Sequence, residues 1–77
     1  MKAHIITKTY DNNSTVIDRV FSSKKKAEKW LEKDLETYRL DGYTTQWMLG
    51  RGYLKQWEVF KNGDRKYIYR IESVEVE

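Results

Sequence analysis

One segment of the chain, residues 23–40, has the apolar spacing of an α-helix, and the segments on either side are rich in β-branched and aromatic residues. At about 100° per residue, one side of this helix collects the apolar side chains Ala27, Trp30, Leu31, Leu35 and Tyr38. The pair Ser22-Ser23 offers an N-cap oxygen, and Gly42 follows the helix where a positive φ is favoured. Such a chain combines one helix with several strands.

The segments that flank the helix predict antiparallel hairpins. A first hairpin over about residues 2–21 turns at Asp11-Asn12-Asn13-Ser14, because Asn and Asp tolerate left-handed backbone angles. After the helix, strands are expected at about 43–49, 53–61 and 65–76. Asn62-Gly63 between the last two is a strong hairpin signal. The sequence therefore predicts a single small α+β domain of order ββαββ(β), an antiparallel sheet with one helix packed on one face.

The register of the last hairpin stays open at this point. If Asn62-Gly63 is a two-residue loop, Trp57 faces Ile68. If the loop has three residues and begins at Lys61, Trp57 meets Tyr67 instead. A shift of one residue changes which side chains share a face, and the sequence does not decide between the two loops.

Length and composition limit the class of protein. With 77 residues, 9.3 kDa and a formal net charge of +3, the chain has room for one small domain. It contains no cysteine, which excludes a disulfide scaffold. No window approaches the roughly 18 consecutive apolar residues of a membrane span. The opening MKAHIITKTY lacks the apolar run of a secretory signal, so we expect a cytoplasmic protein.

The residues needed for common catalytic sites are missing. His4 is the single histidine, and without cysteine the chain cannot build a Cys/His zinc site or a Cys–His pair. A serine triad would depend on that histidine within a predicted strand, with no nucleophile elbow nearby. We therefore expect a non-enzymatic protein with no catalytic residue, metal, cofactor or small-molecule substrate. Its helix has no predominantly basic polar face, so a membrane is not expected as a partner either.

With catalysis not expected, binding to a partner through the protein surface is the remaining class of function. The C-terminal half has the residue types for it. Residues 43–71 carry six basic and two acidic side chains, interleaved with aromatic ones. We expect more rings than one helix can cover, and leftover apolar surface usually marks an interaction site. The candidate binding residues are Trp47, Arg51, Tyr53, Lys55, Trp57, Tyr67, Tyr69 and Arg70.

Two kinds of partner fit this set. Trp, Tyr and Arg dominate the hot spots of protein interfaces, which favours a protein partner, either a host protein or a second copy of the chain. The alternative is single-stranded nucleic acid, with bases stacked on rings and phosphates held by cations. In that alternative the stacking residues are Trp47, Tyr53, Trp57 and Tyr69, and the phosphate contacts are Arg51, Lys55 and Arg70.

Two further features of the helix invite a functional interpretation. Lys24, Lys25 and Lys26 occupy its first turn, where free amides and cations together form a possible anion site, although solvent exposure alone explains them as well. Asp34 falls on the apolar side, where a carboxylate needs a partner on a strand or a place at the rim.

The run VFSSKKKAEKWLEK, followed by Trp57-Glu58-Val59-Phe60-Lys61-Asn62-Gly63, resembles small, uncharacterised α+β proteins encoded by phages, prophages and other mobile elements. The resemblance covers about residues 15–76 and implies the arrangement hairpin, helix, hairpin. It also implies a function by binding and redirecting a host protein, and it assigns no site residue. The positive charge differs from that of acidic inhibitors that mimic DNA.

Overall fold

The computed structural model of the chain describes residues 1–49 and 55–76. The elements along the chain are β1 (Lys2–Tyr10), β2 (Thr15–Phe21), α1 (Lys24–Leu40), β3 (Thr44–Leu49), β4 (Lys55–Lys61) and β5 (Asp64–Glu75). The predicted α+β fold is therefore confirmed: one small domain with an antiparallel sheet and a single helix. Residues 53 and 54, which were expected to begin the fourth strand, lie outside the described residues.

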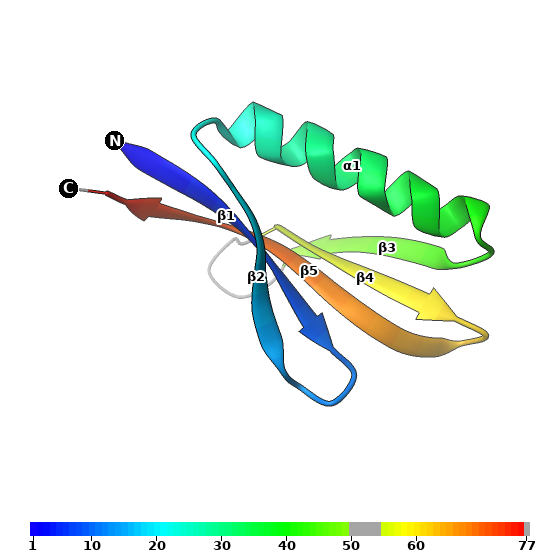
Figure 1. Ribbon diagram of the computed structural model, residues 1–77. Helices are drawn as coiled ribbons and strands as arrows, with labels where there is room; N and C mark the ends of the chain where they lie inside the picture. Colours follow the sequence, from blue (N-terminus) through cyan, green and yellow to red (C-terminus); the bar gives the residue numbers. More distant parts are fainter. Residues whose placement is uncertain (50–54, 77) are drawn as a thin grey trace.

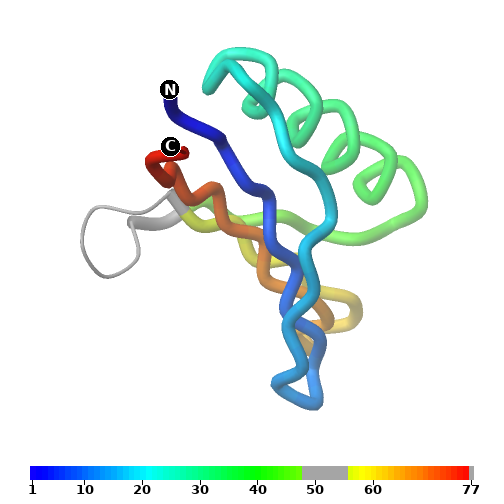
Figure 2. Tube along the Cα trace, turned by 60° about the vertical axis from the view of Figure 1, so that its left-hand side comes forward, coloured from blue at the N-terminus to red at the C-terminus, as the bar shows by residue number. Residues whose placement is uncertain are grey.

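The five strands form one sheet in the order β2-β1-β5-β4-β3, and every neighbouring pair is antiparallel. The first and last strands of the chain are thus partners in the middle of the sheet, and β2 and β3 are its edges. Helix α1 lies across one face (Figure 1). The chain ends come together beside β1 and β5 (Figure 2), where the Val76 N–H donates to the Met1 carbonyl at 2.8 Å.

The core lies between α1 and the centre of the sheet. The helix contributes Ala27, Leu31 and Leu35, all fully buried, as its apolar spacing predicts. The sheet contributes Ile6 from β1, Val59 from β4, and Tyr69 and Ile71 from β5. Because β-strand side chains alternate between faces, these residues identify the face that α1 covers.

The ends of α1 agree with the capping expected from the sequence. The Ser23 side chain accepts a hydrogen bond from the Lys26 backbone N–H at 3.4 Å. After the helix, the Gly42 N–H donates to the Arg39 carbonyl at 3.1 Å, and Gly42 has a φ of +89°. An L side chain would be strained at that φ, so the glycine allows the chain to leave the helix directly into β3.

The hairpin of β4 and β5 has a tight turn and a β-bulge beside it. Asn62 and Gly63 both have positive φ, 54° and 83°, and Lys61 pairs with Asp64 across this two-residue loop. Phe60 then pairs with Arg65, but Val59 pairs with Tyr67. Lys66 is thus an extra residue on β5, and the register beyond it is shifted by one.

This bulge makes both sequence-based pairings of Trp57 wrong. Trp57 pairs with Tyr69, rather than with Ile68 or Tyr67. The two-residue loop itself was one of the two predicted loops, and it is present. The pairing beyond it differs because a bulge inserts a residue after the turn has already been closed, which loop length alone does not reveal.

The hairpin of β1 and β2 contains a second β-bulge. Arg19 pairs with Ile6, whereas Ile17 pairs with Thr7, so that Asp18 is the extra residue. The turn between the strands follows the prediction from the Asn-rich segment: Asn13 has a φ of 68°, and the Tyr10 N–H donates to the Ser14 carbonyl at 2.8 Å.

Leu31→Ala should lower the free energy of unfolding by about 2–5 kcal/mol, because it leaves a cavity between α1 and the sheet. The matched control is Leu40→Ala on the same helix, where the side chain is 83% exposed and the loss should stay within about 0.5 kcal/mol. Urea unfolding followed by circular dichroism measures both. Equal effects of the two variants would contradict this placement of the core.

Candidate binding surface

The predicted binding rings of β4 and β5 point toward the helix. Tyr67 and Tyr69 alternate with Ile68 on β5 and lie on the face that carries Ile71 of the core. Trp57 pairs with Tyr69 and therefore shares this face. Tyr69 is only 1% exposed, and Trp57 and Tyr67 are partly buried against the core.

The expected surplus of exposed rings is therefore mostly absent from the described part of the sheet. Tyr69 cannot contact a partner and does not belong to a binding surface. The helix and the rings themselves account for this, because the register places the aromatic side chains of β4 and β5 in one layer beneath α1. Tyr53 and Arg51 lie outside the described residues, and Lys55 is placed through its backbone pairing with Ile71.

Trp47 is the exception among the predicted rings that the structure describes. It pairs with Trp57 on the neighbouring strand, so it also lies on the helix side of the sheet. Its strand, β3, is the last in the sheet order, and Trp47 is 52% exposed there. Near the start of the same strand the Arg39 Nε donates to the Thr45 hydroxyl at 2.8 Å, and this hydrogen bond links α1 to the β3 edge.

A lysine–tyrosine cluster, made of Lys8, Tyr10, Tyr38, Tyr67 and Tyr69, fills the space between β1, β5 and α1. The Lys8 Nζ lies 4.2 Å from the ring centroid of Tyr67 and donates to the Tyr38 hydroxyl at 3.1 Å. The Tyr38 and Tyr69 hydroxyls are 2.9 Å apart. A half-buried cation on ring faces with a hydrogen-bonded phenol pair is a stabilising arrangement, and it holds these rings in place.

The role of Lys8 in this cluster was not predicted from the sequence. Ile6, Lys8 and Tyr10 alternate on β1, and Ile6 is a core residue, so the spacing places the ammonium on the buried face. That alternation is the signal that could have identified it.

The environment of the cluster changes the pKa of two groups. Partial burial lowers the pKa of Lys8, but its hydrogen bond to Tyr38 and the neighbouring phenols outweigh that effect, and the resulting pKa is raised. Burial raises the pKa of Tyr69 well above its usual range. The hydrogen bond with Tyr38 and the nearby charges of Asp34 and Asp18 act in the same direction. Both groups therefore keep their protons in the folded protein at neutral pH.

Arg70 lies on the other face of the sheet, away from α1, because it alternates with Tyr69 and Ile71. Its Nε donates to the Gln56 side-chain oxygen at 2.9 Å, and Gln56 in turn donates to Glu58 at 3.3 Å. Arg65 completes the chain with an ion pair to Glu58 at 3.6 Å.

The position of Arg70 bears on the nucleic-acid alternative. Trp47 and Trp57 lie on one side of the sheet and Arg70 on the other, so these residues cannot hold the bases and phosphates of one strand together. Arg70 is moreover engaged by Gln56 on its own face. The described residues therefore give the predicted stacking platform little support.

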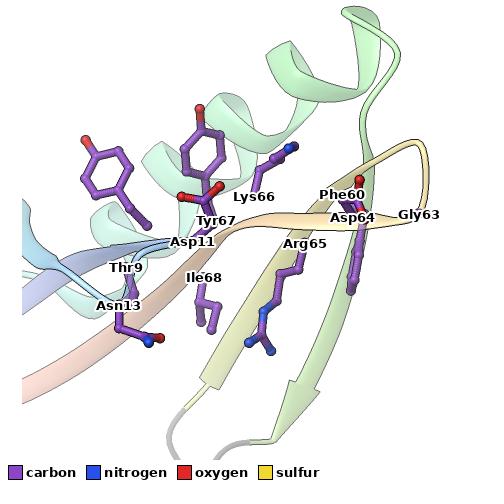
Figure 3. A pocket seen from close by; sticks show the side chains of 11 residues that line it. Thr9, Asp11, Asn13, Phe60, Gly63, Asp64, Arg65, Lys66, Tyr67 and Ile68 are labelled. Carbon is purple, nitrogen blue, oxygen red and sulfur yellow. The ribbon is translucent and has the colours of Figure 1, made fainter.

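A hollow of about 320 Å³ lies between the two hairpin turns. Figure 3 shows Tyr67 pointing to the helix side of β5 and Ile68 to the opposite side, with Thr9 and Asn13 from the first hairpin beside them. The charged side chains that line it are of both signs: Asp11, Asp64, Arg65 and Lys66. Among the described residues that line the hollow there is no Cys, His or Ser.

The remaining sequence candidates lie on α1. Lys24, Lys25 and Lys26 are all exposed, and the anion site suggested for them stays a prediction. Asp34 is half-buried at the rim of the helix, close enough to Tyr69 to influence its pKa. Within residues 1–49 and 55–76, no three His, Asp or Glu side chains gather where they could hold a metal ion. No helix in those ranges is long and apolar enough to cross a bilayer.

Comparison of the chain with models of protein families, with curated proteins and with solved structures finds no match.

Tyr69→Phe should change how stability depends on pH. In the unfolded chain Tyr69 ionises near pH 10, whereas the fold keeps it protonated, so its contribution to stability is complete below pH 10 and is lost as the pH rises further. For this one group the slope is at most about 1.4 kcal/mol per pH unit. At pH 7 the variant should be less stable by about 1 kcal/mol, the value of one hydrogen bond. That deficit should shrink toward about pH 11.

The measurement is urea unfolding of both proteins across this pH range, with the neutral-pH difference as the internal control. A deficit of constant size from neutral to alkaline pH would show that the Tyr69 phenol is not held protonated by the fold.

Proposed function

We propose that the chain is a non-enzymatic binding module that binds a protein partner at the β3 edge of its sheet, around Trp47. The observation that carries this proposal is the half-exposed indole on an edge strand. Trp is one of the residues enriched in interface hot spots, and its large ring gains much from burial by a partner.

The backbone of β3 supports the same surface. An edge strand presents unpaired N–H and C=O groups, and natural proteins usually protect them with charges, prolines or bulges. The segment Thr44–Leu49 contains no charged residue and no proline, and its pairing with β4 has no shift of register. An extended segment of another protein can therefore add to the sheet here, with the strand pairing giving affinity and Trp47 giving specificity.

The residues around Trp47 hold its side chain in place, which favours a role in binding. Its Cα partner on β4 is Trp57, which is itself packed against the core. Arg39 fixes the nearby Thr45 to the helix. An indole supported in this way loses little freedom on binding, which lowers the entropic cost of association.

The resemblance to small phage-encoded proteins supports a host protein as the partner, and the absence of cysteine supports a cytoplasmic setting. The net charge of +3 favours an acidic rim on the partner surface, because complementary charge speeds association. These properties describe a phage-type accessory protein that acts by occupying a surface of its target.

Trp47→Ala should strongly weaken binding of the partner without unfolding the protein. The test is affinity capture from a lysate of the natural host, run with and without nuclease, followed by titration of the captured protein with purified variants. A loss of about 2 kcal/mol or more, roughly thirtyfold in affinity, is expected for a hot-spot tryptophan. Gln46→Ala is the matched control, because Gln46 is exposed on the same strand but faces the other side of the sheet.

Equal binding by wild type and Trp47→Ala would overturn the proposal. So would capture that disappears with nuclease alone, since nucleic acid would then be the ligand.

The fluorescence of the three tryptophans should stay unchanged when single-stranded DNA or RNA is added at low salt. A stacking site would quench an exposed indole, and its affinity would fall steeply and log-linearly as salt is raised. A quench with that salt dependence would support the nucleic-acid alternative and would count against a protein partner.

A further inference from the structure

Strand β2 forms the second free edge of the sheet, and it exposes three apolar side chains. Val16, Ile17 and Val20 are 44%, 65% and 58% exposed. Strand β2 pairs on one side with β1 and is the last strand at that end of the sheet order. Apolar side chains gathered on an edge strand are unusual in a protein that stays monomeric.

The bulge at Asp18 decides which of these side chains share a face. Ile17 pairs with Thr7 and Val20 with Ile5, and both of those β1 residues lie on the face away from α1. Without a bulge, residues three apart in a strand would point to opposite faces. The extra residue therefore places Ile17 and Val20 side by side on the open face.

The same bulge places Asp18 and Arg19 on the helix side. The Arg19 guanidinium lies 5.3 Å from the ring centroid of Trp30 on α1. In a β-bulge two residues oppose one residue of the partner strand, so Asp18 and Arg19 together oppose Ile6, a core residue of the helix-covered face. Two opposite charges thus sit next to each other at the middle of the strand, on one face.

We propose that β2 pairs antiparallel with β2 of a second copy of this chain, about a two-fold axis between Asp18 and Arg19. The two sheets then join into one continuous sheet with both helices on the same side. In this register each residue faces a partner of matching chemistry: Ile17 faces Val20, Val16 faces Phe21, and Asp18 faces Arg19 of the second copy.

One symmetry requirement and two observations single out this register. An antiparallel pair about a two-fold axis must match residues that lie on the same face. Counted by sequence alone, Ile17 and Val20 would fail that condition, and the bulge is what satisfies it. The register also forms two Asp18–Arg19 contacts of opposite charge, whereas a slip of one residue in either direction places Asp18 opposite Asp18 or Arg19 opposite Arg19 of the second copy.

Bulges and charges on an edge strand usually discourage pairing with other chains. In β2 they exclude most registers and most partners, but they fit a second copy of the same strand. Specificity of this kind comes from repulsion in the wrong pairings as well as attraction in the right one. The contact involves one short strand from each copy, which is smaller than a standard interface, so we expect a weak dimer that forms with rising concentration.

The test uses the full chain in sedimentation velocity over a wide range of concentration, with two charge variants. Asp18→Arg gives a strand with two cations at its centre, and Arg19→Asp gives one with two anions. Each variant alone brings like charges together and should remain monomeric where the wild type associates. An equimolar mixture of the two variants should associate again, because every central contact then joins opposite charges.

Two controls accompany the mixture. Val74→Lys changes an exposed apolar residue on β5 and should leave the association of the wild type unchanged. Trp47→Ala, at the opposite edge of the sheet, should do the same and separates this surface from the one around Trp47. Circular dichroism establishes that each variant is folded.

The proposal is overturned if the wild type is monomeric at every concentration. It is also overturned if the single charge variants associate as the wild type does, or if the mixture of folded variants fails to associate.

Discussion

The extra residue at Lys66 determines which side chains the sheet presents to its helix. The Asn62-Gly63 turn closes the last hairpin with two residues, and the bulge beyond it shifts the pairing by one. Trp57 is thereby set opposite Tyr69, and the rings of β4 and β5 join the layer under α1. With the uninterrupted pairing the same rings would divide between the two faces, and the helix would lack the aromatic surface on which it packs.

Both hairpins contain a β-bulge, but the two bulges have different effects. In β5 the bulge directs large side chains inward and helps to build the core. In β2 the bulge directs Ile17 and Val20 outward to the open face and keeps Asp18 and Arg19 together on the other. The two edges of the sheet consequently differ in chemistry: β3 is uncharged and carries one exposed indole, whereas β2 combines aliphatic side chains with a pair of opposite charges.

Local signals in the sequence were sufficient to predict the kinds of elements and their order. The serine cap, Gly42, the Asn-rich turn and Asn62-Gly63 each act over a few residues, and the structure contains each of them. Strand order depends on pairing between segments that are distant in the sequence. The register depends on the two bulges, and the residues next to Lys66 and Asp18 show no pattern that predicts a bulge. The binding prediction failed at Tyr69 for this reason: whether that ring is exposed depends on pairings that its own neighbours do not encode.

The position of β5 has a consequence for biosynthesis. Its partner in the centre of the sheet is β1, so a central strand pair links residues 2–10 to residues 64–75. While the ribosome is still making residues 64–75, the first hairpin and the helix have no central strand to pack against. Contacts of such long sequence separation also form slowly. The native core therefore cannot form until β5 has been made, and strands left unpaired until then are of the kind that promotes aggregation.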